Sequence, residues 1–268
     1  MNDNRYWIQK NDNYELFLDY LRRTSQNLPG WLSYFAPHKN YEMHYEQLEE
    51  ITPFCSFWKN IPYKELDLNE ALLQRSSTPI DKLNNTWTEQ DILFLLNRAI
   101  SDGTRRRNNG KDFGQIIPLR NYPSGGAEYP IIPYIVFNKT IGRFTKNHSY
   151  KIHGDIGFLS ENATSSDLSF KDIFAIGQFN NKLSYKMENI SFAIIFAMNL
   201  KDSFIKYRTF SQQLAFIEAG HIAQNIQLIT AAMNKSSICS GGVLNDQARK
   251  FTNVKDDDTF FIYGVFVG

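Results

Sequence analysis

The chain has 268 residues, 42% of them hydrophobic and 15% aromatic, and a formal net charge of +1. This length and composition can bury the core of one large domain, and the near-neutral charge gives no electrostatic reason to expect a nucleic-acid or membrane partner. With only two cysteines, we expect neither a disulfide framework nor a cysteine metal site. The N-terminal segment is polar and the chain has no long apolar run, so we expect no secretory signal and no membrane span. These features together predict a cytoplasmic protein.

The first part of the chain is predicted to be a separate N-terminal extension. Residues 1–60 are rich in aromatic side chains and show helical spacing over 15–23, which is unlike a disordered tail. Aromatic residues of this kind would suit docking to a partner protein. Residues 61–268 then form the main domain.

The main domain is predicted to combine helices with a mixed sheet. Thr88, followed by Asp91 three residues later, is typical of a helix that begins with a capping box. Residues 101–119 are rich in glycine and asparagine, which predicts a loop of about 19 residues. The expected helices are 66–74, one beginning at Thr88, and 212–233, and the expected strands are 131–137, 191–198 and 260–267. These elements indicate an α+β fold with helices flanking the sheet.

Three consecutive arginines, at 105–107, lie within the predicted loop. They lack the interleaved aromatic side chains of many nucleic-acid interfaces. We therefore expect a solvated loop here, and no nucleic-acid partner.

The run from Arg120 to Pro130, directly before the strand 131–137, is the most distinctive segment of the sequence. An arginine offers a planar cation that matches a phosphate, and glycines let the backbone approach a flat or anionic ligand closely. The alternative is an ordinary turn that leads into a strand, because proline and glycine clusters mostly mark turns. The candidate binding residues of this run are Arg120, Pro123, Ser124, Gly125 and Gly126.

Two shorter segments carry similar residue types. Arg75-Ser76-Ser77 follows a short predicted helix, and Gly241-Gly242 follows the long one. An arginine with two serines can donate hydrogen bonds to a phosphate, and paired glycines let a backbone N–H reach a ligand. A surface turn is the alternative for each segment. Cys239, just before the glycines, is expected to be a small buried filler.

Lys206 and Tyr207 lie side by side ahead of the long helix, and each has a side chain that can exchange a proton. The ordinary pKa values of lysine and tyrosine side chains are near 10, so a base that works near neutral pH needs surroundings that favour loss of its proton. Adjacent residues point to opposite faces of a strand, so both side chains can serve one site only if this stretch is a loop or turn. The alternative is an anchored tyrosine flanked by surface cations.

The order Arg-x-x-Pro-Ser-Gly-Gly-Ala-x-Tyr-Pro, from Arg120 to Pro130 and followed by a strand, resembles the flavin-binding segment of one enzyme family. This family is the nitroreductase-fold azoline dehydrogenases of the SagB type, the FMN subunits of synthetases that build thiazoles and oxazoles in peptides. Glu218 and His221 lie in a helix that is similar to the core helix of that family, where we expect them to be structural. Glu128 departs from the family pattern, which usually has an apolar residue before Tyr-Pro.

The resemblance implies a nitroreductase-like α+β fold and an intertwined homodimer with FMN at its interface. It implies contacts to FMN from the Arg120–Gly126 run and from Arg75, Ser76 and Ser77, with a backbone N–H of Gly241 or Gly242 near the flavin N5. Lys206 and Tyr207 would remove a proton while a thiazoline or oxazoline is oxidised to its azole, and dioxygen would reoxidise the FMN.

The partners implied are an azoline-containing precursor peptide and the cyclodehydratase subunits of a synthetase. Two alternatives remain open from the sequence. One is an NAD(P)H-dependent nitro- or quinone reductase. The other is a non-catalytic subunit that docks other parts of a peptide-modifying synthetase.

Overall fold

The computed structural model describes residues 53–57, 66–108, 116–162, 167–178 and 185–268, except for the side chains of 102–108, 116–118 and 185. The predicted helix at 15–23 and most of the 1–60 extension lie outside these ranges. In the described ranges the elements, in chain order, are β1 (Cys55–Ser56), α3 (Leu68–Gln74), η2 (Ile80–Lys82), α4 (Glu89–Ala99), β2 (Asp102–Asn108), β3 (Ile116–Arg120), η3 (Gly125–Ala127), β4 (Ile131–Phe137), β5 (Ser149–His153), β6 (Phe158–Asn162), η4 (Phe170–Ile173), η5 (Ala175–Gln178), η6 (Tyr185–Asn189), β7 (Phe192–Asn199), α5 (Lys201–Tyr207), α6 (Phe210–Ala232), β8 (Ser237–Ser240), α7 (Asn245–Phe251) and β9 (Thr259–Val267).

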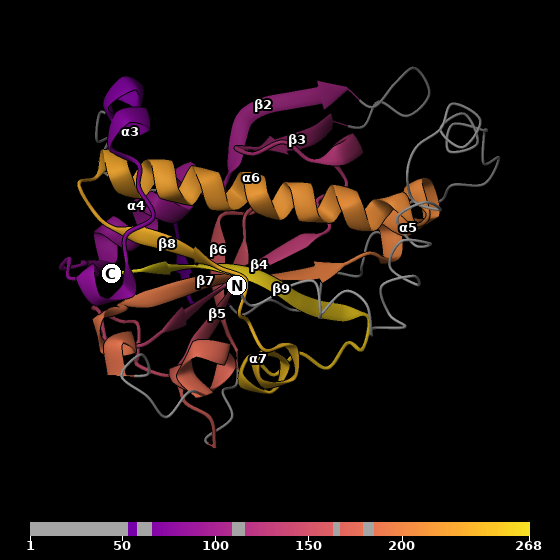
Figure 1. Cartoon of the computed structure of the whole chain (residues 1–268). Helices are drawn as coiled ribbons and strands as arrows, with labels where there is room; N and C mark the ends of the chain where they lie inside the picture. Colours follow the sequence, from indigo (N-terminus) through magenta and orange to yellow (C-terminus); the bar gives the residue numbers. More distant parts are fainter. Residues whose placement is uncertain (1–52, 58–65, 109–115, 163–166, 179–184) are drawn as a thin grey trace, which may run out of the picture.

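Seven strands form one sheet in the order β1-β6-β5-β4-β7-β9-β8 (Figure 1). Every pair of neighbouring strands in it is antiparallel, so the predicted mixed sheet is wrong in strand direction, whereas the α+β class is confirmed. The central strands β4 and β7 are continuous apolar runs buried on both faces. Runs of this kind are usual in parallel sheets, and burial alone does not reveal strand direction.

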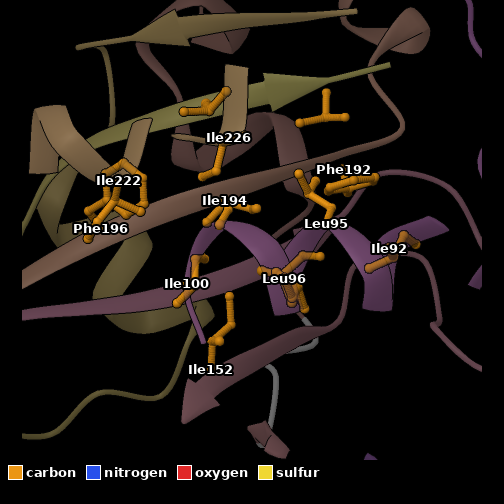
Figure 2. Close-up of a cluster of buried hydrophobic side chains, with 14 of the residues drawn as sticks. Ile92, Leu95, Leu96, Ile100, Ile152, Phe192, Ile194, Phe196, Ile222 and Ile226 are labelled. Carbon is orange, nitrogen blue, oxygen red and sulfur yellow. The ribbon is translucent and has the colours of Figure 1, made fainter. Parts of the chain in front are cut away.

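Helical layers cover the two faces of the sheet. On one face α4 and α6 pack against side chains of the central strands, and Figure 2 shows Leu95 and Leu96 of α4 close to Ile194 of β7, with Ile222 and Ile226 of α6 nearby. The residues that alternate with Ile194 along β7 pack against α7 and the short 3-10 helices on the opposite face. Among the described residues no helix is long and apolar enough to cross a membrane.

Several predicted elements are confirmed with small shifts at their ends. The strand predicted at 131–137 is β4 with the same bounds, and the long helix predicted at 212–233 is α6. Helix α4 begins after Thr88 with the expected capping box. The Thr88 Oγ1 accepts a hydrogen bond from the Asp91 N–H at 3.2 Å, and the Asp91 carboxylate accepts one from the Thr88 N–H at 3.2 Å.

The long loop predicted at 101–119 is wrong in its described parts. Strands β2 and β3 pair antiparallel, with Asp102 opposite Arg120 and Asn108 opposite Ile116. The three arginines at 105–107 therefore belong to a strand rather than to a loop. Glycine and asparagine disfavour strands only weakly, and pairing with a partner strand overrides that preference. The hairpin ends at Arg120 and so leads directly into the glycine-containing run.

Candidate active site

The glycine-containing run folds into a tight turn with an unusual backbone. Gly126 has φ of 66°, and Ala127 and Tyr129 have φ of 62° and 51°. Residues other than glycine rarely adopt this left-handed conformation. Those that do often lie at functional sites, where contacts with the rest of the protein hold the strained backbone in place. The 3-10 helix η3 spans the first part of this turn, and we call residues 124–129 the active-site loop.

Arginine and tyrosine side chains hold the active-site loop together. The Ser124 hydroxyl accepts a hydrogen bond from the Tyr129 N–H at 2.9 Å, and the Tyr129 hydroxyl accepts one from the Arg120 N–H at 3.0 Å. The Arg120 guanidinium donates to the Tyr122 hydroxyl at 2.8 Å and lies 4.6 Å from the centre of the Tyr129 ring. Arg120, predicted as a phosphate ligand, therefore has a loop-holding role in this structure.

A buried carboxyl group lies beneath the active-site loop. Glu218 of α6 is 1% exposed, and its Oε1 accepts a hydrogen bond from the Ile131 N–H at 3.3 Å. Burial raises the pKa of Glu218 to about 7, although the neighbouring Ser124 side chain and the charge of Arg120 act in the opposite direction. This residue ties the start of β4, directly after the active-site loop, to the core helix.

Helix α5 brings the two predicted catalytic side chains to the same loop. Lys206 and Tyr207 occupy its last turn, so the expectation of a loop or turn is wrong in detail. Neighbouring residues of a helix are about 100° apart around its axis, and both can therefore reach one place. A Cβ added to Gly126 would lie 2.6 Å from the Lys206 Nζ and still closer to the Tyr207 hydroxyl. Glycine at 126 is thus what lets both side chains meet the loop.

Lys206 also has a partner that the sequence reasoning missed. Its Nζ lies 2.6 Å from the Glu128 Oε1, and 5.2 Å from the centre of the Tyr207 ring. The signal for Glu128 was present in the sequence as a carboxylate within a proline- and glycine-rich run, but nothing there linked it to Lys206. Lys206 and Tyr207, predicted to transfer a proton, therefore lie together at this loop, and one carboxylate lies beside Lys206.

A second group of predicted residues gathers around β8. The Thr78 N–H donates to the Ser237 carbonyl at 3.1 Å, which ties the segment after Arg75 to β8. Ser76 and Ser77 are exposed. A Cβ at Gly241 would meet no atom within 4 Å, whereas one at Gly242 would lie 3.4 Å from Ala175. Gly241 therefore offers open backbone directly after β8.

Cys239 in this second group behaves as a structural residue. Burial raises the pKa of its thiol, although a hydrogen bond with Tyr263 and the charge of Arg75 act in the opposite direction. Burial also raises the pKa of Tyr263 to about 12. A raised thiol pKa opposes formation of the reactive thiolate. The structural role agrees with the filler that the sequence predicts, but Cys239 is half-buried rather than buried.

The structure keeps the two groups of predicted residues apart. The active-site loop and α5 contact the N-terminal part of α6, while α3, which leads into Arg75, packs beside its other end (Figure 1). Lys206 and Tyr207 meet the active-site loop at Gly126, and the segment after Arg75 is tied to β8. A single chain does not join the two groups into one site.

Comparisons with known proteins agree with this architecture. The model of the nitroreductase family matches residues 88–268. One chain of the Escherichia coli microcin synthetase McbBCD complex, with truncated pro-MccB17 bound, is similar at 17% identity and a TM-score of 0.59, over 91% of this chain and 82% of that one. A structure described as a nitroreductase from Ralstonia eutropha is similar at 15% identity and a TM-score of 0.55, over 78% of this chain and 87% of that one. No curated protein matches the sequence. These structural likenesses establish the fold.

Proposed function

Because the chain belongs to the nitroreductase family, we propose that this flavin oxidoreductase is an FMN-dependent azoline dehydrogenase. Its substrate would be a thiazoline or oxazoline ring in a ribosomal peptide, which it would oxidise to the aromatic azole. The observation that carries the proposal is the meeting of Lys206 and Tyr207 with Gly126. The order of residues from Arg120 to Pro130, which resembles the flavin-binding segment of azoline dehydrogenases, supports it.

The residues of both groups fit a cofactor that joins a phosphate to a flat ring. Arg75, Ser76 and Ser77 would hold the phosphate, since a guanidinium and hydroxyl groups donate hydrogen bonds to its oxygens. The open backbone at Gly241 leaves room for a ring at van der Waals distance. Residues 123–126 and Gly242 would complete the contacts. FMN, when bound, supplies the acceptor for the two electrons that leave the azoline.

The chain's own task is to position the azoline and to move its proton. The α-carbon proton of the ring is acidified by the neighbouring imine and carbonyl groups. Lys206 and Tyr207, fixed at the active-site loop, would take that proton, and a positioned base of this kind typically accelerates a reaction by about 10²–10⁴-fold. Aromatisation of the ring drives the reaction forward, so positioning and proton transfer are the main demands on the protein.

We also propose that two copies of the chain complete the site and that it works within a synthetase. Helices α3 and α6, which pack on each other, expose large apolar side chains that a second copy could cover: Leu68, Leu72, Leu73, Phe216 and Ile217. A twofold arrangement would let the group around β8 of one copy meet the active-site loop of the other. The E. coli complex, which holds a microcin precursor peptide, supports a peptide substrate and cyclodehydratase partners.

The visible spectrum of the purified protein tests the cofactor assignment. We expect a yellow protein that releases FMN into the supernatant when heated. A colourless protein that stays colourless with added FMN would contradict the proposal and would favour a non-catalytic docking subunit. Rapid bleaching by NAD(P)H, with no oxidation of azolines, would instead identify a nitro- or quinone reductase.

Replacing Gly241 by alanine separates binding of the flavin from folding. A Cβ at this position meets no protein atom within 4 Å, so we expect the free energy of unfolding to change by less than about 0.5 kcal/mol. The same methyl group would enter the space assigned to the flavin, and we expect the Kd for FMN to rise at least about tenfold. Flavin fluorescence titration measures this, and an unchanged Kd would remove Gly241 from the binding site.

A further inference from the structure

Glu128 is placed with unusual constraint for a residue in a loop. The residues on both sides of it, Ala127 and Tyr129, have left-handed backbone conformations. Tyr129 is fixed in turn by its hydrogen bonds with Ser124 and Arg120. The Glu128 side chain is only 11% exposed and its Oε1 lies 2.6 Å from the Lys206 Nζ. The loop therefore holds this carboxylate against the lysine.

This contact changes what Lys206 can do. An ammonium and a carboxylate at 2.6 Å form a charge-assisted hydrogen bond, with a proton between the two atoms. A lysine side chain is long and flexible, so this bond fixes where its Nζ lies.

We propose that Glu128 is a positioning residue that acts through Lys206, holding its Nζ at Gly126 by a charge-assisted hydrogen bond. The effect of this contact on turnover rests on the proposed function, whereas the control of Lys206 by Glu128 does not.

Acylation of lysine side chains measures this control without flavin or substrate. The full chain is treated with a limiting amount of acetic anhydride at pH 7.5, and the acetylation of Lys206 is followed by peptide mass spectrometry. Only the neutral amine reacts, so we expect Glu128→Gln and Glu128→Leu each to speed acetylation of Lys206 by about tenfold, the scale for loss of a partly buried charged partner. Lys201, at the other end of α5 and paired with Asp256, is the internal reference.

The glutamine variant decides the result, because it keeps the size and the hydrogen-bonding oxygen of glutamate but not its charge. An acetylation rate of Lys206 equal to that of the unchanged protein in Glu128→Gln would overturn the proposal, since the contact would then be only structural. Asp256→Asn is the matched control, and we expect it to speed acetylation of Lys201 alone.

Turnover gives an independent second readout. Where azoline oxidation is measurable, we expect Glu128→Gln to lower kcat about tenfold with KM unchanged, because the Lys206 Nζ is then no longer held at the active-site loop while the binding contacts remain. An unchanged kcat would contradict the positioning role. If the chain oxidises no azoline, the proposed function fails, and the acylation result still decides whether Glu128 controls Lys206.

Discussion

Replacement of Lys206 by alanine is expected to lower kcat for azoline oxidation by about 10²–10⁴-fold, the range for loss of a positioned proton-transfer group. The reason is geometric, since the Lys206 Nζ lies at the active-site loop, 2.6 Å from the place of a Gly126 Cβ. We expect Tyr207→Phe, which removes only a hydroxyl group from the same place, to have an effect in the same direction. Peptide mass spectrometry of timed samples measures both, as loss of two hydrogen atoms per ring.

The control for this prediction lies on the same helix. Lys201 begins α5 and forms exposed ion pairs with Asp256 and Asp258. Surface ion pairs contribute little to stability, so Lys201→Ala should fold normally and keep its activity within about twofold. Bound flavin and the unfolding midpoint of each variant must match those of the unchanged protein. A Lys206→Ala variant that meets these conditions and oxidises azolines at the normal rate would remove Lys206 from the mechanism.

The second large effect concerns stability and pH. Burial raises the pKa of Glu218 from 4.5 to about 7 in the folded protein, so the folded state binds more protons than the unfolded state between these two values. Stability from this residue is therefore greatest below about pH 4.5 and is lost as the pH rises towards 7. At about 1.4 kcal/mol per unit of pKa difference, the total loss amounts to about 3 kcal/mol.

Glu218→Gln removes this titration while keeping the shape of the side chain. Relative to the unchanged protein, we expect the variant to gain about 2–3 kcal/mol in free energy of unfolding between pH 5 and pH 8. Urea denaturation at the two pH values measures this difference. His153, whose pKa is lowered to about 4 by burial, has the opposite pH trend, but it is common to both proteins and cancels. An equal difference at both pH values would show that Glu218 does not titrate in this range.

The sequence was sufficient where local pattern decides structure. The strand at 131–137 follows from an uninterrupted apolar run bounded by Pro130 and Asn138, and the start of α4 follows from the capping box at Thr88. Both signals lie within a few residues of the element that they predict. The hairpin of β2 and β3 was missed because it depends on pairing between two segments rather than on a local signal. Its two segments pair with each other, but Asp102–Asn108 is polar and contains glycine, and Ile116–Arg120 is short and interrupted by Pro118, so neither segment has a clear strand signal of its own.

The candidate site was predictable only in part, because its contacts join distant positions. The Lys206–Glu128 pair spans 78 residues of sequence, and the hydrogen bond between Glu218 and Ile131 spans 87. No spacing rule connects such residues. Resemblance to a family was what selected Lys206 and Tyr207, and the structure then placed both at Gly126. The contacts of Arg120 with Tyr122 and Tyr129 could not be predicted from its residue type, and its role toward a cofactor stays a prediction.

The most direct test of the central proposal is the mass of an azoline-containing peptide after incubation with the FMN-loaded protein in air. The peptide is first cyclised by a cyclodehydratase, so that thiazoline or oxazoline rings are present. We expect each ring to lose two hydrogen atoms and to acquire the ultraviolet absorbance of an aromatic azole, with no requirement for NAD(P)H. A flavin-loaded protein that leaves the mass of the peptide unchanged, but oxidises NAD(P)H with a nitro compound or quinone as acceptor, would contradict this function.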